Sequence, residues 1–215
     1  MTVCVAGSQY IPSVEYFAHW MRNGLLTLEA HEHYQKRTWR NKTAILGPEI
    51  PLILTVPLQK GKHQQLLIGQ VAIAYDEPWY KNHMSAIKTA YGKTAYFNEI
   101  ASGLEHIYLS GISTLWELNK VIIEFIIDLL PGEWRSDLTD HFHHHFTPQV
   151  VDLRHGVPAG LYAQPGLPYP VYQQVQRLHK THLPNLSILD ALCHLGPDTY
   201  TYLDKYATIL YDSHD

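Results

Sequence analysis

The sequence has few cysteines and no excess of positive charge. Cys4 and Cys193 stand far apart in apolar surroundings, which is typical of buried thiols in a reducing compartment; a single disulfide is the less favoured alternative. The chain has 16 Lys plus Arg and 20 Asp plus Glu, so its net charge is −4. A general basic field of the kind that holds nucleic acid is therefore lacking, and any anion site has to be local.

Long hydrophobic runs are also lacking. The longest, residues 121–130, contains Glu124 and Asp128 and has about half the length needed to span a bilayer. The first seven residues have neither the basic start nor the apolar stretch of a signal peptide. We therefore expect a cytoplasmic protein with no membrane span and no nucleic-acid partner.

Several common catalytic and cofactor motifs are missing. The sequence has no G-x-G-x-x-G, no G-x-S-x-G and no H-E-x-x-H, which leaves dinucleotide binding, hydrolase-elbow and zincin chemistry without support. Gly92-Lys93-Thr94 resembles the end of a phosphate-binding P-loop, but Ile87 stands where the earlier glycine should be. The sequence thus indicates no particular cofactor.

The hydrophobic pattern predicts an α/β fold, a single domain over residues 1–215 with a mixed or mostly parallel sheet flanked by helices. The opening order of strand, loop and helix is typical of sheets whose ligands bind at the carboxyl ends of the strands. A Gly- and Pro-rich stretch favours an ordered loop over residues 156–170. We expect strands over 3–5, 25–29, 53–57 and 66–75, and helices over 14–23, 79–91, 115–130 and, as the last helix, 187–195.

The densest polar segment, residues 29–42, follows the second expected strand. Its second half contains Lys36 and Arg40 among four basic side chains, enough to hold a phosphate or carboxylate. Its first half offers Glu29, His31 and Glu32. The two carboxylates could support the His31 imidazole as a general base or acid. A solvated strand-to-loop surface with incidental charges is the competing interpretation.

A histidine-rich run occupies residues 141–145. Clustered imidazoles bind zinc or nickel, but zinc needs three or four ligands in fixed geometry, and neither a cysteine nor a spaced carboxylate pair accompanies the run. We expect no intrinsic metal here, and a polar surface loop that picks up metal opportunistically.

Five segments in register resemble the WbqC-like family. Gln9 to Pro12 followed by Tyr16-Phe17 resembles the family's N-terminal H-Q-P-x-Y-L-P and G-Y-F motifs, although Ala6, Gly7 and Ser8 replace its opening His-Gln-Pro. The other segments are similar to the aromatic K-R-S/T-aromatic-x-N-R element, the L-T-V-P strand, the central helix and the closing motif; they are residues 34–42, residues 54–57, Trp79 with His83 and Ala90-Tyr91, and residues 183–190.

A second departure concerns the acids of the family pattern. Many relatives carry Asp-Asp after the second strand, where this sequence has Ala30 and His31. One branch of the family replaces those acids with a Glu-x-His-Glu pattern, which Glu29, His31 and Glu32 fit. Either the chemistry has moved to these residues, or this branch acts on a different substrate.

The resemblance implies a role in surface-polysaccharide (O-antigen) assembly. One suggestion for the family is the transfer of glycine onto a sugar, which implies an acyl or aminoacyl transferase with a sugar nucleotide and an acyl donor as small-molecule partners. Lys36 and Arg40 are then expected to hold the anionic part. His31, oriented by Glu29 or Glu32, would activate the acceptor, and Asn41 would donate to the oxyanion.

A further expectation concerns the positions of Tyr10 and His83. Tyr10 and His83 should face the same crevice as Lys36 and Arg40, because loops at the carboxyl ends of strands converge on one edge. Two other functions stay open: a non-catalytic protein that binds a sugar nucleotide or a partner enzyme, and a metal-dependent enzyme. Oligomeric state, donor and acceptor are left open by the sequence.

Overall fold

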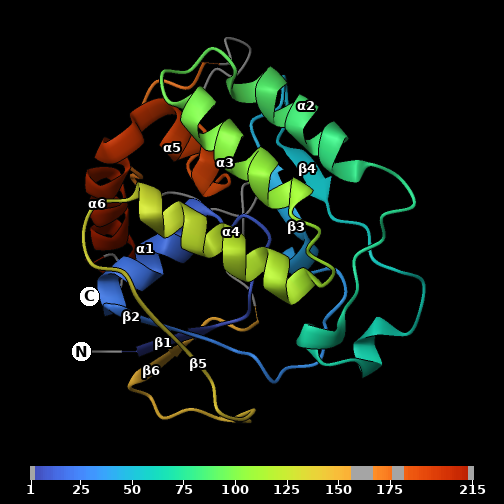
Figure 1. Cartoon of the computed structure of the whole chain (residues 1–215). Coiled ribbons are helices and arrows are strands. Elements are labelled where there is room, and N and C mark those ends of the chain that lie inside the picture. Colours follow the sequence, from blue (N-terminus) through green and yellow to red (C-terminus); the bar gives the residue numbers. More distant parts are fainter. Residues whose placement is uncertain (1–2, 156–166, 176–181, 213–215) are drawn as a thin grey trace.

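A four-stranded parallel sheet occupies the lower part of the molecule (Figure 1). The computed structural model describes residues 3–155, 167–175 and 182–212. The strands lie in the order β5-β2-β1-β6, and every neighbouring pair is parallel. This confirms the predicted α/β fold with a mostly parallel sheet. The strands are β1 (Val3–Ala6), β2 (Leu25–Leu28), β5 (Arg135–Leu138) and β6 (Val150–Asp152).

Helix α1 (Val14–Asn23) connects β1 to β2 and packs against both strands. It ends where expected, because Gly24 adopts the left-handed conformation (φ 76°) that a side chain would disfavour. Its outer side packs against α6 (Thr199–Asp212), the last helix of the described chain. The helix therefore holds the loop after β1 between the sheet and the C-terminal part of the fold.

A second, two-stranded sheet follows the polar segment. It is an antiparallel hairpin of β3 (Lys42–Ile45) and β4 (Leu52–Thr55). Short 3-10 turns lie on either side of it; they are η1 (Trp39–Asn41), η2 (His63–Gln65) and η3 (Ile68–Gln70). Thus the basic segment does not run on as one surface loop, because its end enters a turn and then a strand.

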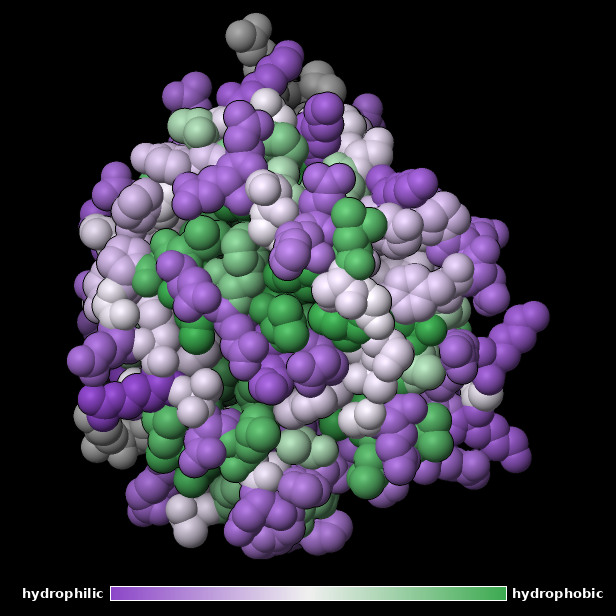
Figure 2. All heavy atoms as spheres, viewed as in Figure 1, coloured by the Kyte–Doolittle hydropathy of each residue, from purple (hydrophilic) through white to green (hydrophobic). Residues whose placement is uncertain are grey.

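Four further helices complete the described fold: α2 (Trp79–Tyr91), α3 (Phe97–Leu109), α4 (Leu115–Leu129) and α5 (Ile188–Leu195), followed by the turn η4 (Gly196–Asp198). The predicted start of α4 is confirmed, since the Thr114 side chain accepts a hydrogen bond from the Glu117 backbone. Figure 2 shows hydrophobic side chains between hydrophilic ones on the face that α3 and α4 present. No helix in the described ranges is long and apolar enough to cross a membrane.

Three secondary-structure expectations need correction. Residues 66–75 do not form a strand: Gly69 lies in turn η3, and only isolated bridges at Leu67, Ala72 and Ile73 remain. Residues 187–195 form the expected helix, α5 with its cap at Ser187, but it is not the last one, because α6 follows after the turn η4. Helix α3 and strands β3, β5 and β6 were not expected. Most of the loop expected over residues 156–170 lies outside the described residues.

Candidate functional site

Four loops meet at the carboxyl ends of the parallel strands, and the buried acid Glu29 lies among them. Its Oε1 accepts hydrogen bonds from the Thr139 hydroxyl (2.8 Å) and from the backbone N–H of His31 (2.9 Å). Its Oε2 lies 3.4 Å from Nη1 of Arg154. Glu29 is therefore a structural link between the ends of β2, β5 and β6, since it joins residues that follow each of them.

A second buried acid, Glu32, forms an ion pair with Arg40, here called the edge pair. Arg40 donates from Nε to Oε1 (2.7 Å) and from Nη2 to Oε2, and both side chains are almost fully buried. Gly7 makes room for it, because a Cβ at this position would lie 2.9 Å from Nη2 of Arg40 and 3.0 Å from Oε1 of Glu32. Burial raises the pKa of Glu32, and the contact with Arg40 opposes that effect.

The edge pair changes the role expected for Arg40. A guanidinium that binds a buried carboxylate with two of its nitrogens, and the Arg154 carbonyl at 3.1 Å, is part of the protein framework. It therefore does not project into a crevice as an anion-binding group. The carboxylates of Glu29 and Glu32 bind other partners, and neither forms a hydrogen bond with the ring of His31. The structure therefore does not have the expected orientation of that ring by an acid.

His31 is exposed, and its ring is held by a different partner. Its Nε2 lies 3.0 Å from the carbonyl oxygen of Thr139. Because a carbonyl only accepts, Nε2 carries the hydrogen of the neutral ring and Nδ1 keeps its lone pair. The structure thus orients His31 as a base candidate through a backbone carbonyl at the end of β5.

Lys36 lies on the wall of an open cleft of about 370 Å³, here called the edge cleft, beside Glu32. Its volume falls within the usual range for small-molecule sites. Lys36 is exposed, so its ammonium is available to an anionic ligand. The cleft is lined by Glu32, His33, Tyr34, Gln35, Lys36, Gln64 and Phe142.

Tyr10 and His83 are brought together, but deep in the core and away from the edge-cleft lining. The Tyr10 hydroxyl bonds to Nδ1 of His83 (2.8 Å) and to the hydroxyl of Tyr108, a row here called the tyrosine–histidine chain. His83 also donates to the backbone of Thr55, so its Nδ1 accepts from Tyr10. Burial lowers the pKa of His83 to about 4, so the ring is neutral at neutral pH.

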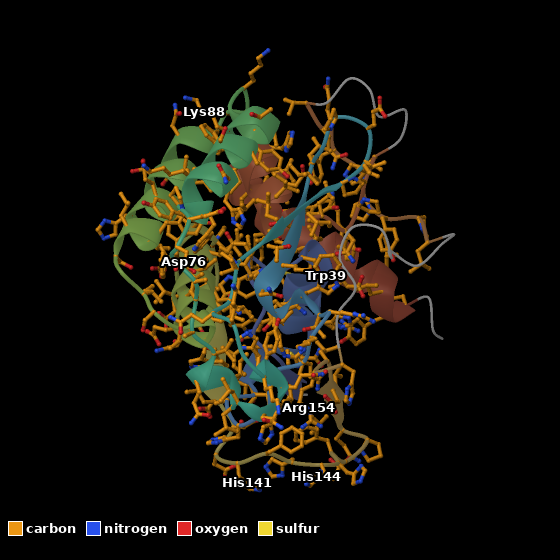
Figure 3. The ribbon with its side chains drawn as sticks, turned by 90° about the vertical axis from the view of Figure 1, so that its right-hand side faces the viewer. Trp39, Asp76, Lys88, His141, His144 and Arg154 are labelled. Carbon is orange, nitrogen blue, oxygen red and sulfur yellow. The ribbon has the colours of Figure 1, made fainter. Side chains whose placement is uncertain are left out.

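The tyrosine–histidine chain borders a second pocket, also of about 370 Å³. Trp79 and His83 form its inner wall, and the carboxylates of Asp76 and Glu77 line its exposed side. Figure 3 shows Asp76 well away from Arg154 and His141. His83 therefore faces a different pocket from Lys36, and the single crevice expected from the sequence is two separate pockets.

Asn41 is also part of the framework. Its Oδ1 accepts from the Tyr34 hydroxyl (3.1 Å), and its Nδ2 donates to the carbonyl of Val56 (2.9 Å). Both ends of the amide are thus engaged inside the protein, and Asn41 does not present a donor to an oxyanion. The first loop and the polar segment contact each other through the backbone, where Tyr10 N–H donates to the Trp39 carbonyl (3.1 Å).

Arg154 is the main site residue that the sequence analysis missed. Its guanidinium binds Asp152 at two nitrogens and the carbonyl of His143 (2.6 Å), and it stacks over the rings of Phe142 and Phe146. The hydrogen bonds with Asp152 raise the pKa of Arg154. A signal was available, since Val150-Val151 is a short β-branched pair and Arg154 stands three residues behind it.

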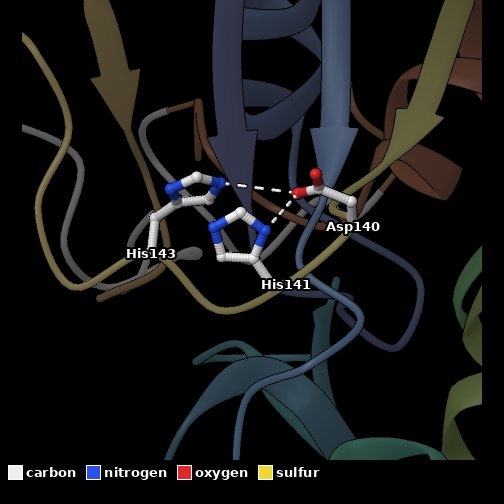
Figure 4. Close-up of side chains that lie close together, drawn as sticks. All are labelled: Asp140, His141 and His143. Carbon is white, nitrogen blue, oxygen red and sulfur yellow. Dashed lines mark ion pairs between the residues drawn. The ribbon is translucent and has the colours of Figure 1, made fainter.

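Arg154 also fixes the histidine-rich segment, here called the histidine loop (residues 140–146). Asp140 contacts both His141 and His143, and the three side chains place one possible metal-ligand atom each within 4.8 Å of one another (Figure 4). The expected polar surface loop is present. Asp140 is the carboxylate that accompanies the imidazoles, and it was not among the residues expected from the sequence.

The sequence model of the WbqC-like protein family matches residues 7–165, well over half of the chain. The chain belongs to this family. Neither the curated proteins nor the solved structures contain a match. The matched WbqC-like region includes the edge pair, the edge cleft and the tyrosine–histidine chain, but it ends before the segment at 183–190 that resembles the family's closing motif.

In that last segment of this WbqC-like chain, polar residues hold helix ends. Asn185 accepts from the backbone of Glu15 (3.0 Å) and donates to its carboxylate (2.8 Å), which secures the start of α1. The Ser187 hydroxyl accepts from the Leu189 backbone at the start of α5. Asn185 thus stabilises the start of α1, which follows the loop after β1, and Ser187 stabilises the start of α5.

Proposed function

We propose that this protein transfers a small acyl or aminoacyl group, such as glycyl, onto a nucleotide-linked sugar during surface-polysaccharide assembly. The edge cleft lies at the carboxyl ends of parallel strands, the usual ligand position in such sheets. Membership of the WbqC-like family supports the link to sugar polymers. The observation that carries the proposal is the exposed His31 ring, fixed on the Thr139 carbonyl with Nδ1 available as a base.

The chemistry assigns one role to each available group. Nδ1 of His31 takes the proton from an amino or hydroxyl group of the acceptor sugar as that group attacks the donor carbonyl carbon. A new bond to the acyl carbon forms, and the bond to the donor's phosphate or thiol leaving group breaks. Lys36 attracts the anionic part of the nucleotide at the rim of the cleft. Glu32 of the edge pair lines the cleft, and the pair takes no part in proton transfer.

Turnover measured by mass spectrometry tests this assignment. Purified protein is incubated with nucleoside-diphosphate amino sugars and acyl or glycyl thioester donors, and the product is identified by its mass. His31→Asn should lower the rate about 100-fold or more, the usual contribution of a general base. His106→Asn, an exposed histidine on α3, is the matched control and should leave the rate unchanged. Equal rates for the two variants would remove His31 from the mechanism.

Binding is tested separately by thermal shift with the same sugar nucleotides. Lys36→Ala should weaken their binding about tenfold, which corresponds to ~1.4 kcal/mol. Lys88→Ala changes another exposed lysine, which Figure 3 shows at the opposite end of the molecule from Arg154, and should leave the affinity unchanged. Unchanged affinity in Lys36→Ala would place the ligand elsewhere.

A non-catalytic role in binding a sugar nucleotide or a partner enzyme is the second candidate. The observation that favours it is the engagement of both buried acids, since Glu29 contacts Arg154 and Glu32 contacts Arg40. Neither carboxylate then assists a base directly. Binding of sugar nucleotides that depends on Lys36, with no product for any donor, would support this second function over the first.

A further inference from the structure

We propose that Asp140, His141 and His143 form a site for a divalent transition-metal ion of the zinc type. The proposal is independent of the transferase assignment, because it rests only on the geometry of the histidine loop. One carboxylate and two imidazoles are donors that zinc accepts in proteins, and three protein ligands leave positions for water or an anionic ligand.

The spacing of the donor atoms carries the proposal. Oδ1 of Asp140 lies 2.8 Å from Nδ1 of His141 and 3.5 Å from Nε2 of His143. Zinc–ligand bonds of about 2.0–2.1 Å in tetrahedral geometry require donor atoms roughly 3.3 Å apart. The same carboxylate oxygen thus already lies near metal-ligand spacing from both rings, and small side-chain rotations are enough to admit an ion.

Alternation along the loop explains why only two of the four histidines take part. His141 and His143 lie on one side of the loop, since both rings contact the same carboxylate oxygen of Asp140. Their rings are 3.9 Å apart between centroids. Phe142 and His144 pair in the same way on the other side, with centroids 5.2 Å apart. His144 and His145 are therefore neighbours of the site in sequence but not members of it.

Arg154 holds the loop in this shape. Its guanidinium carbon lies 5.0 Å from the centroid of the Phe142 ring and 4.5 Å from that of the Phe146 ring, and its Nη1 donates to the carbonyl of His143 (2.6 Å). Such anchoring lowers the ordering cost of metal binding. The three ligands remain accessible, since their side chains are 81%, 63% and 39% exposed in chain order. An ion can therefore enter from solvent.

The site also adjoins the edge cleft, because Phe142 lines that cleft and stands in sequence between the two proposed histidine ligands. Figure 3 shows His141 and His144 at the end of the molecule beyond Arg154. The histidine loop thus has one side in the cleft wall and the other side at the proposed metal site.

Zinc binding to untagged, full-length protein tests the proposal. Isothermal titration with Zn²⁺ alone should give one equivalent, and Co²⁺ should give the visible absorption bands of a low-coordinate site. His141→Asn/His143→Asn should weaken binding at least tenfold, and so should Asp140→Asn. The matched control is His144→Asn/His145→Asn, which removes the same number of imidazoles from the same loop and should change the affinity by less than twofold.

Two results would overturn the site. The first is equal loss in the control and in His141→Asn/His143→Asn, which would mean that the run binds ions through any of its imidazoles. The second is less than one equivalent of zinc in the unchanged protein at about 100 times the protein concentration. Circular dichroism shows whether each variant keeps its fold, and because the changed side chains are largely exposed, the fold should be retained.

Discussion

The edge pair and the tyrosine–histidine chain are both buried polar systems, but the first is charged and the second is neutral. The edge pair of Glu32 and Arg40 buries two ionised groups in contact with each other. The tyrosine–histidine chain of Tyr108, Tyr10 and His83 buries three polar groups that are all neutral at neutral pH. A charged group cannot lose its partner without leaving a buried charge, whereas a neutral group loses only a hydrogen bond. The two systems should therefore respond very differently to the same kind of change.

Arg40→Ala should have the largest effect, because it leaves Glu32 buried without its cation. We expect a loss of about 3–5 kcal/mol in the free energy of unfolding, measured by urea denaturation. The double variant Glu32→Leu/Arg40→Met should recover most of that loss, since it removes both charges. A stability change below about 0.5 kcal/mol in Arg40→Ala would show that the pair is a surface pair and would restore Arg40 as a ligand-binding candidate.

Acid should destabilise the fold through His83 of the tyrosine–histidine chain. In the unfolded state the histidine pKa is about 6.5, and in the fold burial lowers it to about 4. Between these values the unfolded state binds more protons, so stability is complete above pH 6.5 and falls as the pH drops toward 4. The loss attributable to His83 is about 2 kcal/mol between pH 7 and pH 5.

Urea denaturation at pH 7 and pH 5 measures this slope. His83→Gln should reduce it without abolishing it, because burial also lowers the pKa of His182 to about 4. His106→Gln, an exposed control, should keep the full slope. If His83→Gln also kept the full loss of stability between pH 7 and pH 5, the tyrosine–histidine chain would not be the source of the acid sensitivity.

Gly7→Ala should test how tightly the charged system is packed. The added Cβ would lie 2.9 Å from Nη2 of Arg40 and 3.0 Å from Oε1 of Glu32, which is closer than van der Waals contact. Overpacking of this kind costs about 1–3 kcal/mol. Gly69→Ala is the control, because nothing lies within 4 Å of its added Cβ. Equal thermal midpoints for the two variants would mean that the pair moves aside freely.

Tyr108→Phe should have the smallest effect, about 1 kcal/mol, since it removes one neutral hydrogen bond to Tyr10. Chemical denaturation of this variant beside Tyr200→Phe, a partly exposed tyrosine on α6, separates the lost hydrogen bond from a general effect of the substitution. A loss as large as that of Arg40→Ala would show that the two systems do not differ in the way their charges imply.

Local signals in the sequence predicted much of the fold. The cap at Thr114, the glycine after Asn23 and the apolar spacing of 79–91 each identify an element from neighbouring residues alone. Strands β5 and β6 were not predicted, because β5 is mostly polar and β6 is three residues long. They are strands because β5 pairs with β2 and β6 pairs with β1. Helix α6 was not predicted, because Gly196 and Pro197 are residues that usually end a helix, whereas here the chain continues helically from Thr199.

The candidate site was predictable as a segment but not as an arrangement. Residues 29–36 do lie at the strand ends and beside the cleft. Which charges are free, however, depends on partners that arrive from elsewhere in the chain. Arg40 is paired because Gly7 leaves room for it, and His31 is oriented by Thr139, more than a hundred residues away. No local pattern contains that information.

The order of the strands in the sheet also has a consequence for how the chain folds. Strand β1 precedes the other described strands in the chain, yet one of its two neighbours, β6, begins at residue 150. The other neighbour, β2, has its second edge paired only by β5, which begins at residue 135. On the ribosome, β1 and β2 therefore have exposed edges until most of the chain has emerged. Contacts so distant in sequence slow folding and leave unpaired strands open to aggregation.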